Sequence, residues 1–372
     1  MSNMRPVTLQ EITTSIFDGK HGDCVDLPGS GLYFISVKDL KEYDIDYSNA
    51  REITPEDFAQ NYLRTSLENG DTIYANTGDT IGKSLFVERN NLADKTSFQK
   101  SVAVLKPNAE MVEPRYLYYL LKYETPRLRQ AATGSGQKNL LLSTMRDFET
   151  RIHDRETQSK IVAVLGCIDQ KIHTNLSIND NLQQMAYDTF MHSFFRKESN
   201  GKLGDIIVEN AKSPIQVGNA KAANNGDIPF FTSGDAILKW PEVLATGRNC
   251  YLNTGGNADV KFYVGDAAYS TDTWCITASG EMSDYLYLLL LSIKPELNQK
   301  YFQGTGLKHL QKPMLKDRPI YIPATKELET FNKTVQPWFD MIASNVKESQ
   351  SLVALRDWLL PMLMNGQAVI ED

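Results

Sequence analysis

The sequence predicts an α+β protein built from two similar α/β units that share an antiparallel pair of long helices. Two observations predict this fold. The polar heptapeptide "GSGQKNL" at residues 134–140 returns as "GTGLKHL" at 304–310, 170 residues later. Each copy follows a set of short strand-like runs and precedes a long stretch with the apolar spacing of a coiled coil. We therefore expect an internal repeat, with one unit near 1–196 and the other near 197–372.

The repeat extends beyond this loop in both directions. At the offset of 170, residues 134–196 match 304–366 without a gap, and apolar positions fall on apolar positions. Upstream, "GDTIYANTG" at 70–78 matches "GRNCYLNTG" at 247–255 with an offset of 177. Farther upstream, "LYFISVKDL" matches "IPFFTSGDA" with an offset of 196. Because the matched blocks keep the same order, both halves are expected to contain the same unit.

The front part of each unit contains short alternating or aromatic runs between turn residues, a pattern typical of strands. These runs are "LYFISV", "DTIYAN", "SLFVE" and "SVAVL" in the first copy and "IPFFTS", "NCYLN", "VKFYV" and "TWCIT" in the second. A helix is expected in "TPEDFAQNYLRTS", with Thr54 as N-cap and Pro55 at the first helical position. Two further helices are expected in "PRYLYYLLKYETPRLRQ" and "SDYLYLLLLSIKPELNQKY".

The back part of each unit carries the apolar spacing of a coiled-coil seam. The seam residues are Ile161, Val164, Leu165, Ile168, Ile172, Ile178, Leu182 and Met185 in the first copy and Phe331, Val335, Trp338, Ile342, Leu352, Leu355 and Leu359 in the second. Asn175 and Asn345 occupy the same place in the two seams, where a buried amide fixes helix register; an amphipathic helix with one polar residue is the alternative. Pro337 predicts a kink or restart of the second helix, and Pro361 predicts its end.

Connectivity predicts how these parts are joined. The first helix leads into the second compact unit, and the second helix returns from it, so the helices should pack antiparallel. The compact units are then expected at opposite ends of a rod, with a pseudo-two-fold axis crossing its middle. The expected segments are 1–139 and 198–309 for the compact units and 140–197 and 310–372 for the helices.

Composition limits the classes of function. No apolar run approaches the length of a membrane span, and the polar start "MSNMRPVTLQ" does not resemble a signal peptide, so we expect a cytoplasmic protein without membrane association. The four cysteines are scattered and do not form a zinc-binding pattern. The net charge of −7 argues against a general nucleic-acid-binding protein, although it permits positive charge confined to a cleft.

Catalytic motifs are not found in the sequence. It has no N-P-P-[FY] methyltransferase motif, no G-x-x-x-x-G-K-[ST] nucleotide loop and no glycine-rich dinucleotide fingerprint. The nearest approach to a nuclease pairing of acid and lysine is "DVK" at 259–261, whose aligned partner "GKS" at 82–84 lacks the acid. We interpret this stretch as a strand with a charged face and expect no catalytic and no metal-binding residue.

Two similar modules around a pseudo-two-fold axis suit a DNA duplex, which has a two-fold symmetry of its own. The stretch "KSVAVLKPN…EPRYLYYLLKY…LRQAATGSGQKNL", followed by "DFETRIHDRETQSKIVAVLGCIDQKI", resembles specificity subunits of Type I restriction–modification systems. It is similar to the end of a target recognition domain and the start of the conserved helix in that family. "IPFFTSGDAILK" and "YFQGTGLKHLQKPMLKDRPIYIPATKELETF" resemble the same elements in the second half. The proline-rich segment often found before the helix reads "RIHDRETQ" and "IPATKE" here.

The resemblance implies a role without catalysis. Such a subunit binds a bipartite, asymmetric double-stranded DNA target, one half per recognition domain, and scaffolds two modification (methyltransferase) and two restriction (translocase/nuclease) subunits. Those partners use S-adenosylmethionine, ATP and Mg, whereas this chain would bind no cofactor. In these terms 1–139 and 198–309 are target recognition domains, and 140–197 and 310–372 are conserved spacer helices. The alternative function is a two-headed protein-binding adaptor without DNA recognition.

The repeated polar loops are the first candidates for DNA contact. Their glycines permit close approach of a backbone, their lysines can meet phosphates, and Gln137 or His309 can face a groove edge; the alternative is a plain hinge. The repeated turn "ANTG" and "LNTG" is either a DNA-facing loop or a β-turn. The candidate residues are Tyr74, Asn76, Thr77, Lys83, Ser135, Gln137, Lys138, Tyr251, Asn253, Thr254, Lys261, Thr305, Lys308 and His309. Base-specific contacts are expected where the copies diverge, in 41–69 and 237–246.

Overall fold

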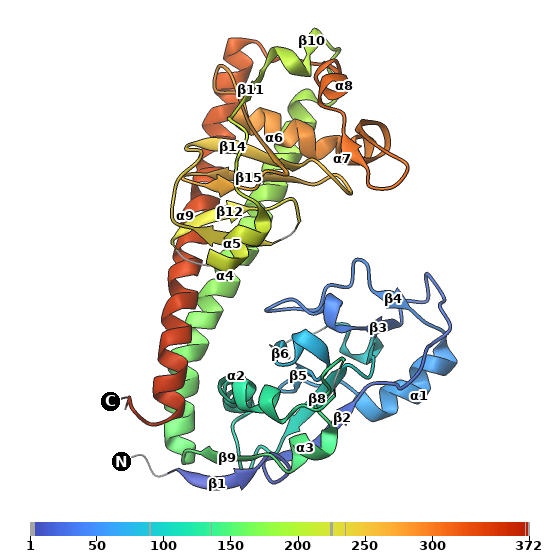
Figure 1. Cartoon of the computed structure of the whole chain (residues 1–372), viewed down its shortest axis with the longest axis vertical. Coiled ribbons are helices and arrows are strands. Elements are labelled where there is room, and N and C mark those ends of the chain that lie inside the picture. Colours follow the sequence, from blue (N-terminus) through green and yellow to red (C-terminus); the bar gives the residue numbers. More distant parts are fainter. Residues whose placement is uncertain are drawn as a thin grey trace. The chain divides into compact units, whose positions relative to one another are not determined.

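The structure is a computed structural model that describes residues 4–88, 91–134, 136–223, 226–234, 236–368 and 370. It divides into two compact units, one formed by Met1–His173 with Ser351–Asp372 and the other by Thr174–Gln350. Both units combine antiparallel sheet with helices, so the α+β class is confirmed (Figure 1). The two long helices, α4 (Arg155–Phe194) and α9 (Thr325–Met364), each contribute one end to each unit.

The first unit is built around an antiparallel sheet of order β2-β8-β5-β6. A second sheet has the order β4-β3-β7, in which β3 and β7 run parallel, and β1 pairs with β9. The elements are β1 (Arg5–Thr8), β2 (Thr13–Asp18), β3 (Tyr33–Ile35), β4 (Arg51–Glu52), α1 (Pro55–Thr65), β5 (Thr72–Ala75), β6 (Ser84–Phe86), β7 (Thr96–Phe98), β8 (Val102–Pro107), α2 (Pro114–Ala131), α3 (Leu142–Arg146) and β9 (Glu149–Ile152). The predicted N-cap of α1 is confirmed, since the Thr54 side chain accepts the N–H of Asp57.

Alternate side chains of the central strand β5 enter different cores of the first unit. Ile73 and Ala75 face the three-stranded sheet, where they pack with Phe98 and other apolar residues. Tyr74 faces the opposite way, into the core that α2 completes. On the outer side of the three-stranded sheet, Phe58 of α1 covers a further apolar cluster. The period of two residues in a strand therefore produces a layered unit of helix, sheet, sheet and helix.

The second unit repeats this topology and adds a two-stranded pair, β18-β19. Its sheets have the orders β11-β17-β14-β15 and β13-β12-β16, β12 and β16 are parallel, and β10 pairs with β20. The elements are β10 (Gly201–Lys202), β11 (Ile207–Glu209), α5 (Val217–Ala223), β12 (Ile228–Phe231), β13 (Ile237–Trp240), β14 (Arg248–Asn253), β15 (Val260–Val264), β16 (Ala268–Tyr269), β17 (Thr273–Ala278), α6 (Ser283–Ser292), α7 (Lys294–Glu296), a π-helical segment (Leu297–Tyr301), β18 (Phe302–Gln303), β19 (His309–Leu310), α8 (Lys312–Lys316) and β20 (Pro319–Ile320). The predicted internal repeat is confirmed. The outer helix differs, because α5 precedes β12, whereas α1 follows β4 in the first unit.

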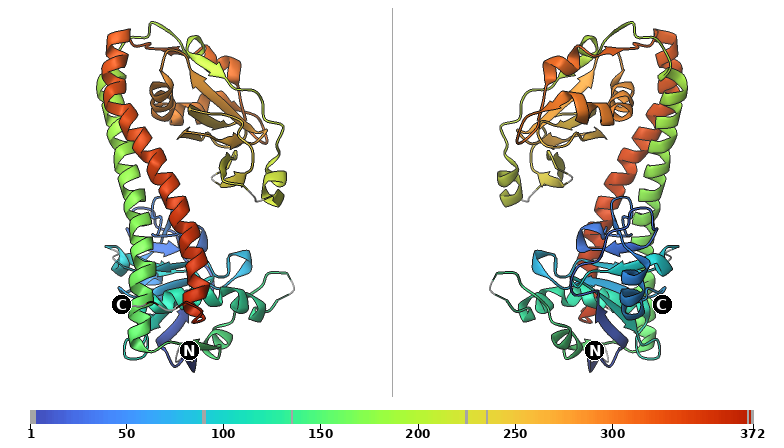
Figure 2. Two further views of the ribbon diagram at one scale, coloured as in Figure 1. Left: turned by 90° about the vertical axis from the view of Figure 1, so that its left-hand side faces the viewer. Right: turned by 90° about the vertical axis from the view of Figure 1, so that its right-hand side faces the viewer.

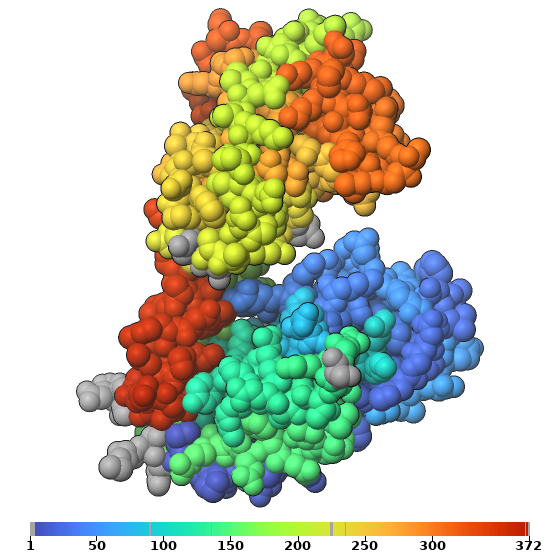
Figure 3. Space-filling model, viewed as in Figure 1, coloured from blue at the N-terminus to red at the C-terminus, as the bar shows by residue number. Residues whose placement is uncertain are grey.

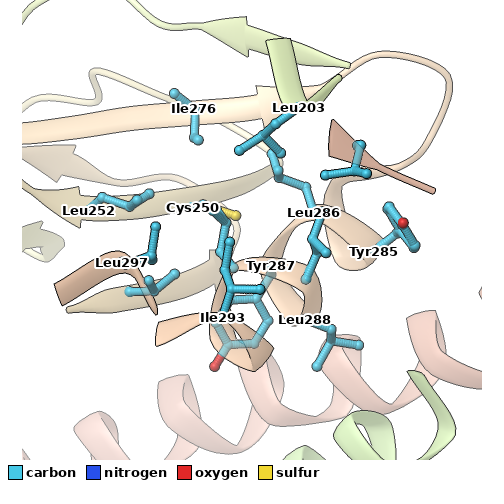
Figure 4. Close-up of a cluster of buried hydrophobic side chains, with 14 of the residues drawn as sticks. Leu203, Cys250, Leu252, Ile276, Tyr285, Leu286, Tyr287, Leu288, Ile293 and Leu297 are labelled. Carbon is cyan, nitrogen blue, oxygen red and sulfur yellow. The ribbon is translucent and has the colours of Figure 1, made fainter. Parts of the chain in front are cut away.

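The largest core of the second unit lies between its four-stranded sheet and α6. Figure 4 shows Cys250, Leu252 and Ile276 of the sheet directed toward Leu286 and Ile293. These side chains are buried, and α6 is apolar on nearly all sides because it lies between the sheet and the long helices.

One block of the sequence repeat is out of register with the structure by one residue. The match at an offset of 177 pairs Tyr74 with Tyr251, but Tyr251 stacks on Phe231 of the three-stranded sheet, the face opposite to that of Tyr74. The structural counterpart of Asn76 is Thr254, since each donates its N–H to the neighbouring strand at the same point of the ladder. A slip of one residue turns every side chain of a strand to the other face, so the equivalence of these two tyrosines is wrong.

The long helices pack antiparallel and carry their buried amides where the seam predicts. Asn175 is fully buried and donates to Glu348 Oε2 at 2.7 Å and Ser349 Oγ at 3.3 Å. Asn345 donates to Asn179 Oδ1 at 2.9 Å. Asn345 and Ser349 lie 170 residues after Asn175 and Asn179, so the two contacts repeat each other with the helices exchanged. A pseudo-two-fold axis therefore crosses the helix pair within the second unit.

Part of the predicted seam is displaced. Three of its residues are exposed, by 36, 48 and 43 %: Ile178, Met185 and Leu355. The buried side chains toward the end of α4 are instead Ala186, Phe190 and Phe194. Phe190 and Phe194 contact Tyr285 of α6, and Phe194 also contacts Phe331 of α9. Because Ala186, Phe190 and Phe194 are spaced by four residues, they lie on one face of α4.

The two prolines do not interrupt α9, which continues through Pro337 and Pro361 to Met364. The predicted restart at Pro337 and end at Pro361 are therefore wrong. Each proline removes one backbone donor, but both rings are exposed, where solvent accommodates the freed carbonyl. Buried neighbours such as Val335, Phe339 and Leu363 hold the helix on either side.

Candidate functional site

The first polar loop follows α2 and closes on itself. Thr133 and Asn139 exchange backbone hydrogen bonds of 3.0 and 2.7 Å, and Gly134 between them has a φ of 119°. A Cβ on Gly134 would lie 2.5 Å from the carbonyl oxygen of Gln137, so this turn requires glycine. In Figure 2 the loop is the green-teal ribbon that projects beyond the rest of the first unit.

The second polar loop has the same construction. Gln303 and His309 form the closing pair. Gly304 has a φ of 150°, and a Cβ on it would clash with the carbonyl oxygen of Leu307 at 2.6 Å. The second glycine of each loop behaves differently, since a Cβ on Gly136 or Gly306 would meet nothing within 4 Å. The first glycine therefore shapes the loop, and the second leaves its tip open to an approaching molecule.

Both loops are anchored to the end of a central strand through the backbone of their lysine. Gly78 donates its N–H to the carbonyl oxygen of Lys138 at 2.7 Å, and Gly256 donates to that of Lys308 at 2.9 Å. The lysine side chains take no part in this anchoring and are exposed. Among the residues that the structure describes, neither lysine has an ion-pair partner. Each unit therefore presents an uncompensated positive charge on a backbone held in place by the sheet.

Two other candidate lysines have structural roles. Lys83 Nζ donates to the carbonyl oxygen of Val37 at 3.2 Å, and burial together with the charge of Lys41 lowers the pKa of Lys83. Lys261 Nζ donates to the carbonyl oxygen of Gly234 at 2.7 Å and pairs with Asp259, which immediately precedes β15. Lys83 thus connects the four-stranded sheet of the first unit to the segment after β3. Lys261 connects the four-stranded sheet of the second unit to the segment after β12. In the structure both lysines are thus engaged in contacts within their own unit.

Four more candidates are buried and belong to the interior. Tyr74 and Tyr251 are 0 and 1 % exposed, and Asn76 and Asn253 are 3 and 5 % exposed. The Asn253 amide closes its own turn by donating to the carbonyl oxygen of Gly255 at 2.7 Å. The repeated turn is thus a turn that ends the central strand, and burial removes these four side chains from the candidate DNA-contacting set.

The remaining candidates form an exposed or half-buried surface in each unit, which we call the loop surface. In the first unit it consists of Thr77, Gln137 and Lys138, and in the second of Thr254, Thr305, Lys308 and His309. Ser135 lies outside the described residues. The segment that follows α2 reaches the surface of the first unit in Figure 3.

Two exposed residues beside the loops were missed by sequence reasoning. Lys100 lies in the turn before β8, next to the strand end that anchors the first loop. Leu307, 64 % exposed, occupies the tip of the second loop at the position of Gln137 in the first, and we add it to the loop surface of the second unit. The repeat itself could have identified Leu307, since at the offset of 170 it replaces a polar amide with an apolar side chain.

Metal-ligating clusters and membrane spans are both absent from the described part of the chain. Within the described residues, no group of three or more His, Cys, Asp or Glu side chains is arranged to hold a metal ion. The helices in the same part of the chain include none with the length and apolar character needed to cross a bilayer.

The repeated unit with its lysine-bearing loop defines a two-module protein. The family model of the Type I restriction modification DNA specificity domain matches residues 19–184 and again 197–351. The chain therefore belongs to the family of Type I restriction–modification specificity subunits, the components that recognise the DNA sequence.

Individual relatives agree with this assignment. The chain is 24 % identical to the Type I restriction enzyme MjaIX specificity subunit of Methanocaldococcus jannaschii, over 92 % of this chain and 88 % of that protein. It is 31 % identical to the HindI specificity subunit of Haemophilus influenzae, over 82 and 88 %. The crystal structure of a Type I restriction–modification S subunit from M. genitalium matches with a TM-score of 0.58 at 13 % identity, over 100 % of this chain and 97 % of that one, which supports the fold.

Proposed function

We propose that this chain reads a bipartite, asymmetric double-stranded DNA target, one half with each unit. The observation that carries this proposal is the duplicated loop surface, in which backbone and lysine are repeated while the tip residue is not. We assign residues 1–139 and 198–309 as target recognition domains and 140–197 and 310–372 as spacer helices. Because the proposed target is DNA, we place the complex in the cytoplasm.

The repeated and the unrepeated parts of the loop surface take different tasks. Lys138 and Lys308 contact phosphates, which position a protein on DNA without reading its sequence. Gln137 and Leu307 occupy equivalent tips with different chemistry. A glutamine amide can pair with the N6/N7 edge of adenine, whereas an apolar side chain can contact the methyl group of thymine. Two units with the same fold thereby recognise different half-sites.

The acidic net charge is compatible with this function. The chain has 46 acidic and 39 basic residues, so its long-range field does not attract DNA. Many exposed carboxylates are paired with lysine or arginine, as in the Lys202–Asp317 pair at 2.9 Å. The loop lysines have no such partner among the described residues, so positive charge is available where the loops contact phosphate.

Catalysis is assigned to partner subunits. We propose that the chain scaffolds two modification (methyltransferase) subunits and two restriction (translocase/nuclease) subunits. S-adenosylmethionine, ATP and Mg would be bound by those partners, and none of them by this chain. The pseudo-two-fold repeat supports a pair of equivalent partner surfaces. Native mass spectrometry of the co-expressed complex should show two modification subunits per chain, and a reproducible one-to-one assembly at saturating partner would contradict the symmetry.

The DNA-binding proposal is tested by the salt dependence of affinity. Neutralising a phosphate releases counterions, so affinity decreases as salt increases. The magnitude of the slope of log K against log salt should decrease by roughly 0.9 for each phosphate that the protein no longer neutralises. We expect this decrease in Lys138→Gln and in Lys308→Gln, and the sum of both in the double variant. Lys326→Gln, which removes an exposed lysine from the first turn of α9, is the matched control and should keep the slope. Absence of DNA binding at every salt concentration would favour the protein-binding adaptor.

A further inference from the structure

Arg356 of α9 is almost completely buried in the first unit, with 4 % of its surface exposed. Its Nη1 lies 2.9 Å from Asp169 Oδ1 of α4. The same nitrogen lies 3.1 Å from Glu42 Oε1 and 2.9 Å from the Tyr43 hydroxyl. A buried guanidinium needs such partners because its charge is poorly stabilised away from water. Arg356 therefore joins the two long helices to a segment more than 300 residues earlier in the sequence.

The recognition domain reaches the same place from a second side. Tyr119 of α2 donates its hydroxyl to Asp169 Oδ2 at 2.7 Å, so both oxygens of this carboxylate are used. We call this set of five residues the Arg356 node; it consists of Glu42, Tyr43, Tyr119, Asp169 and Arg356. Because hydrogen bonds to a planar guanidinium are directional, the node fixes an orientation more strictly than apolar packing does.

The segment that carries Glu42 and Tyr43 is built to present them. Leu40 and Ile45 pair with each other and are buried in the core between the two sheets. Lys41 N–H donates to the carbonyl oxygen of Asp44 at 2.8 Å, which closes the turn. The turn 40–45 is thus fastened at its base, and its tip is directed at the Arg356 node.

At the corresponding position the second unit meets the long helices by different chemistry, although Arg248 of β14 pairs with the neighbouring Asp340 of α9. At the offset of 170 the position of Asp169 is taken by Phe339, and that of Arg356 corresponds to Ala186. The Phe339 ring packs edge-on against Phe262 and Tyr287, with centroids 5.0 and 5.6 Å away. The repeat thus has an apolar contact in the second unit where the first unit has an ion-paired one.

We propose that Glu42 and Tyr43 are positioning residues that, through Arg356, set the orientation in which the first unit presents its loop surface to DNA. This inference rests on the proposed function. Within the divergent segment 41–69, the tip of the turn 40–45 is occupied by its contacts with α9, so we assign this part to positioning. An exchanged recognition domain without these two side chains would leave Arg356 with fewer of its partners.

The test compares Glu42→Gln/Tyr43→Phe, Arg356→Lys and the combined variant, each as the full chain in its complex. The first of these leaves the Asp169–Arg356 pair intact, so the fold is retained. Each protein is titrated with the intact target and with targets in which one half or the other is scrambled. Arg155→Met, which removes an exposed arginine of α4 with no ion-pair partner among the described residues, is the matched control.

For Glu42→Gln/Tyr43→Phe we expect roughly tenfold weaker binding of the intact target, the scale of removing one hydrogen bond to a charged group. The weakened discrimination should concern the half-site that Gln137→Ala also affects, while the other half-site is still discriminated. In the Arg356→Lys background the double substitution should weaken binding little further. The control should bind like the wild type.

Wild-type affinity and half-site discrimination in Glu42→Gln/Tyr43→Phe would overturn the inference. So would equally weakened discrimination of both half-sites together with a lower melting temperature, since that pattern indicates a general structural role. If the wild type itself binds no DNA, the proposed function fails, and hydrogen exchange then tests the docking alone. Faster exchange of the turn 40–45 in Arg356→Lys than in the wild type would support the docking, and unchanged exchange would overturn it.

Discussion

The Asn175 amide donates to Ser349 Oγ at 3.3 Å, and the symmetry-related amide of Asn345 donates to Asn179 at 2.9 Å. One contact is therefore made twice, with α4 and α9 exchanging roles. The Asn175 Oδ1 atom is buried and has no hydrogen-bond partner among the described residues. A buried polar side chain of this kind specifies the register of paired helices while lowering their stability.

Replacing Asn175 with leucine should stabilise the chain. The substitution removes an unpaired buried oxygen, and the released Glu348 is exposed and can be hydrated. We expect a gain of about 1 kcal/mol in the free energy of unfolding, seen as a rise of a few degrees in the melting temperature. Asn345→Leu, at the less buried equivalent, should gain less. A lower melting temperature for Asn175→Leu would show that the amide stabilises the seam.

The two glycines of the first loop should respond differently to alanine. Gly134→Ala forces a Cβ into a backbone with a φ of 119° and places it 2.5 Å from a carbonyl oxygen. The strain should lower stability by about 1–3 kcal/mol and weaken DNA binding. Gly136→Ala has open space and should change stability by less than about 0.5 kcal/mol. Denaturant titration of both variants checks this contrast, which fails if they are equally stable.

Asp284 should make the stability of the second unit depend on pH. Burial outweighs the attraction of Arg248 and raises the pKa of Asp284 from its usual 3.8 to about 6. Between these pH values the folded chain binds more protons than the unfolded chain, so this group lowers stability as pH rises from 4 to 6. In Asp284→Asn that decrease disappears. The difference in unfolding free energy between wild type and variant should change by up to about 3 kcal/mol over this window, and a constant difference would contradict the assignment.

Each recognition domain should be exchangeable on its own. Since the polar loop closes each domain in the same way, replacing residues 1–133 with those of a relative should change one half of the target only. The replacement should carry glutamate and tyrosine at positions 42 and 43 to satisfy Arg356. Sequencing of methylated sites in cells that express the hybrid provides the measurement. A change in both halves would contradict a modular readout.

Local patterns predicted the longer helices and three strands of each four-stranded sheet, but not the short edge strands. Alternating and aromatic runs marked the strands, and the Thr54–Pro55 pair marked the start of α1, because both signals depend on neighbouring residues. Register was harder to predict. Tyr74 and Tyr251 align by sequence although they face different cores, since an aromatic side chain can be buried on either side of a sheet.

The candidate site was predicted less well than the fold. Sequence reasoning found the loops but could not distinguish the exposed Lys138 from the inward-directed Lys83, because burial depends on contacts between distant segments. The Arg356 node joins residues 187 and 314 positions apart, and no local pattern indicates such a pairing. The continuous path of α9 through Pro337 and Pro361 likewise depends on tertiary packing.

The division of the long helices between the units affects the order of folding during synthesis. Leu363 and Met364 are buried in the main core of the first unit, although the whole of Thr174–Gln350 is translated before them. A ribosome adds roughly 5–20 residues per second, so the second unit is fully synthesised before the first one has its complete core. During that interval the nascent first unit exposes the apolar surface that α9 later covers. Folding of the first unit is therefore completed only after the second unit has been synthesised.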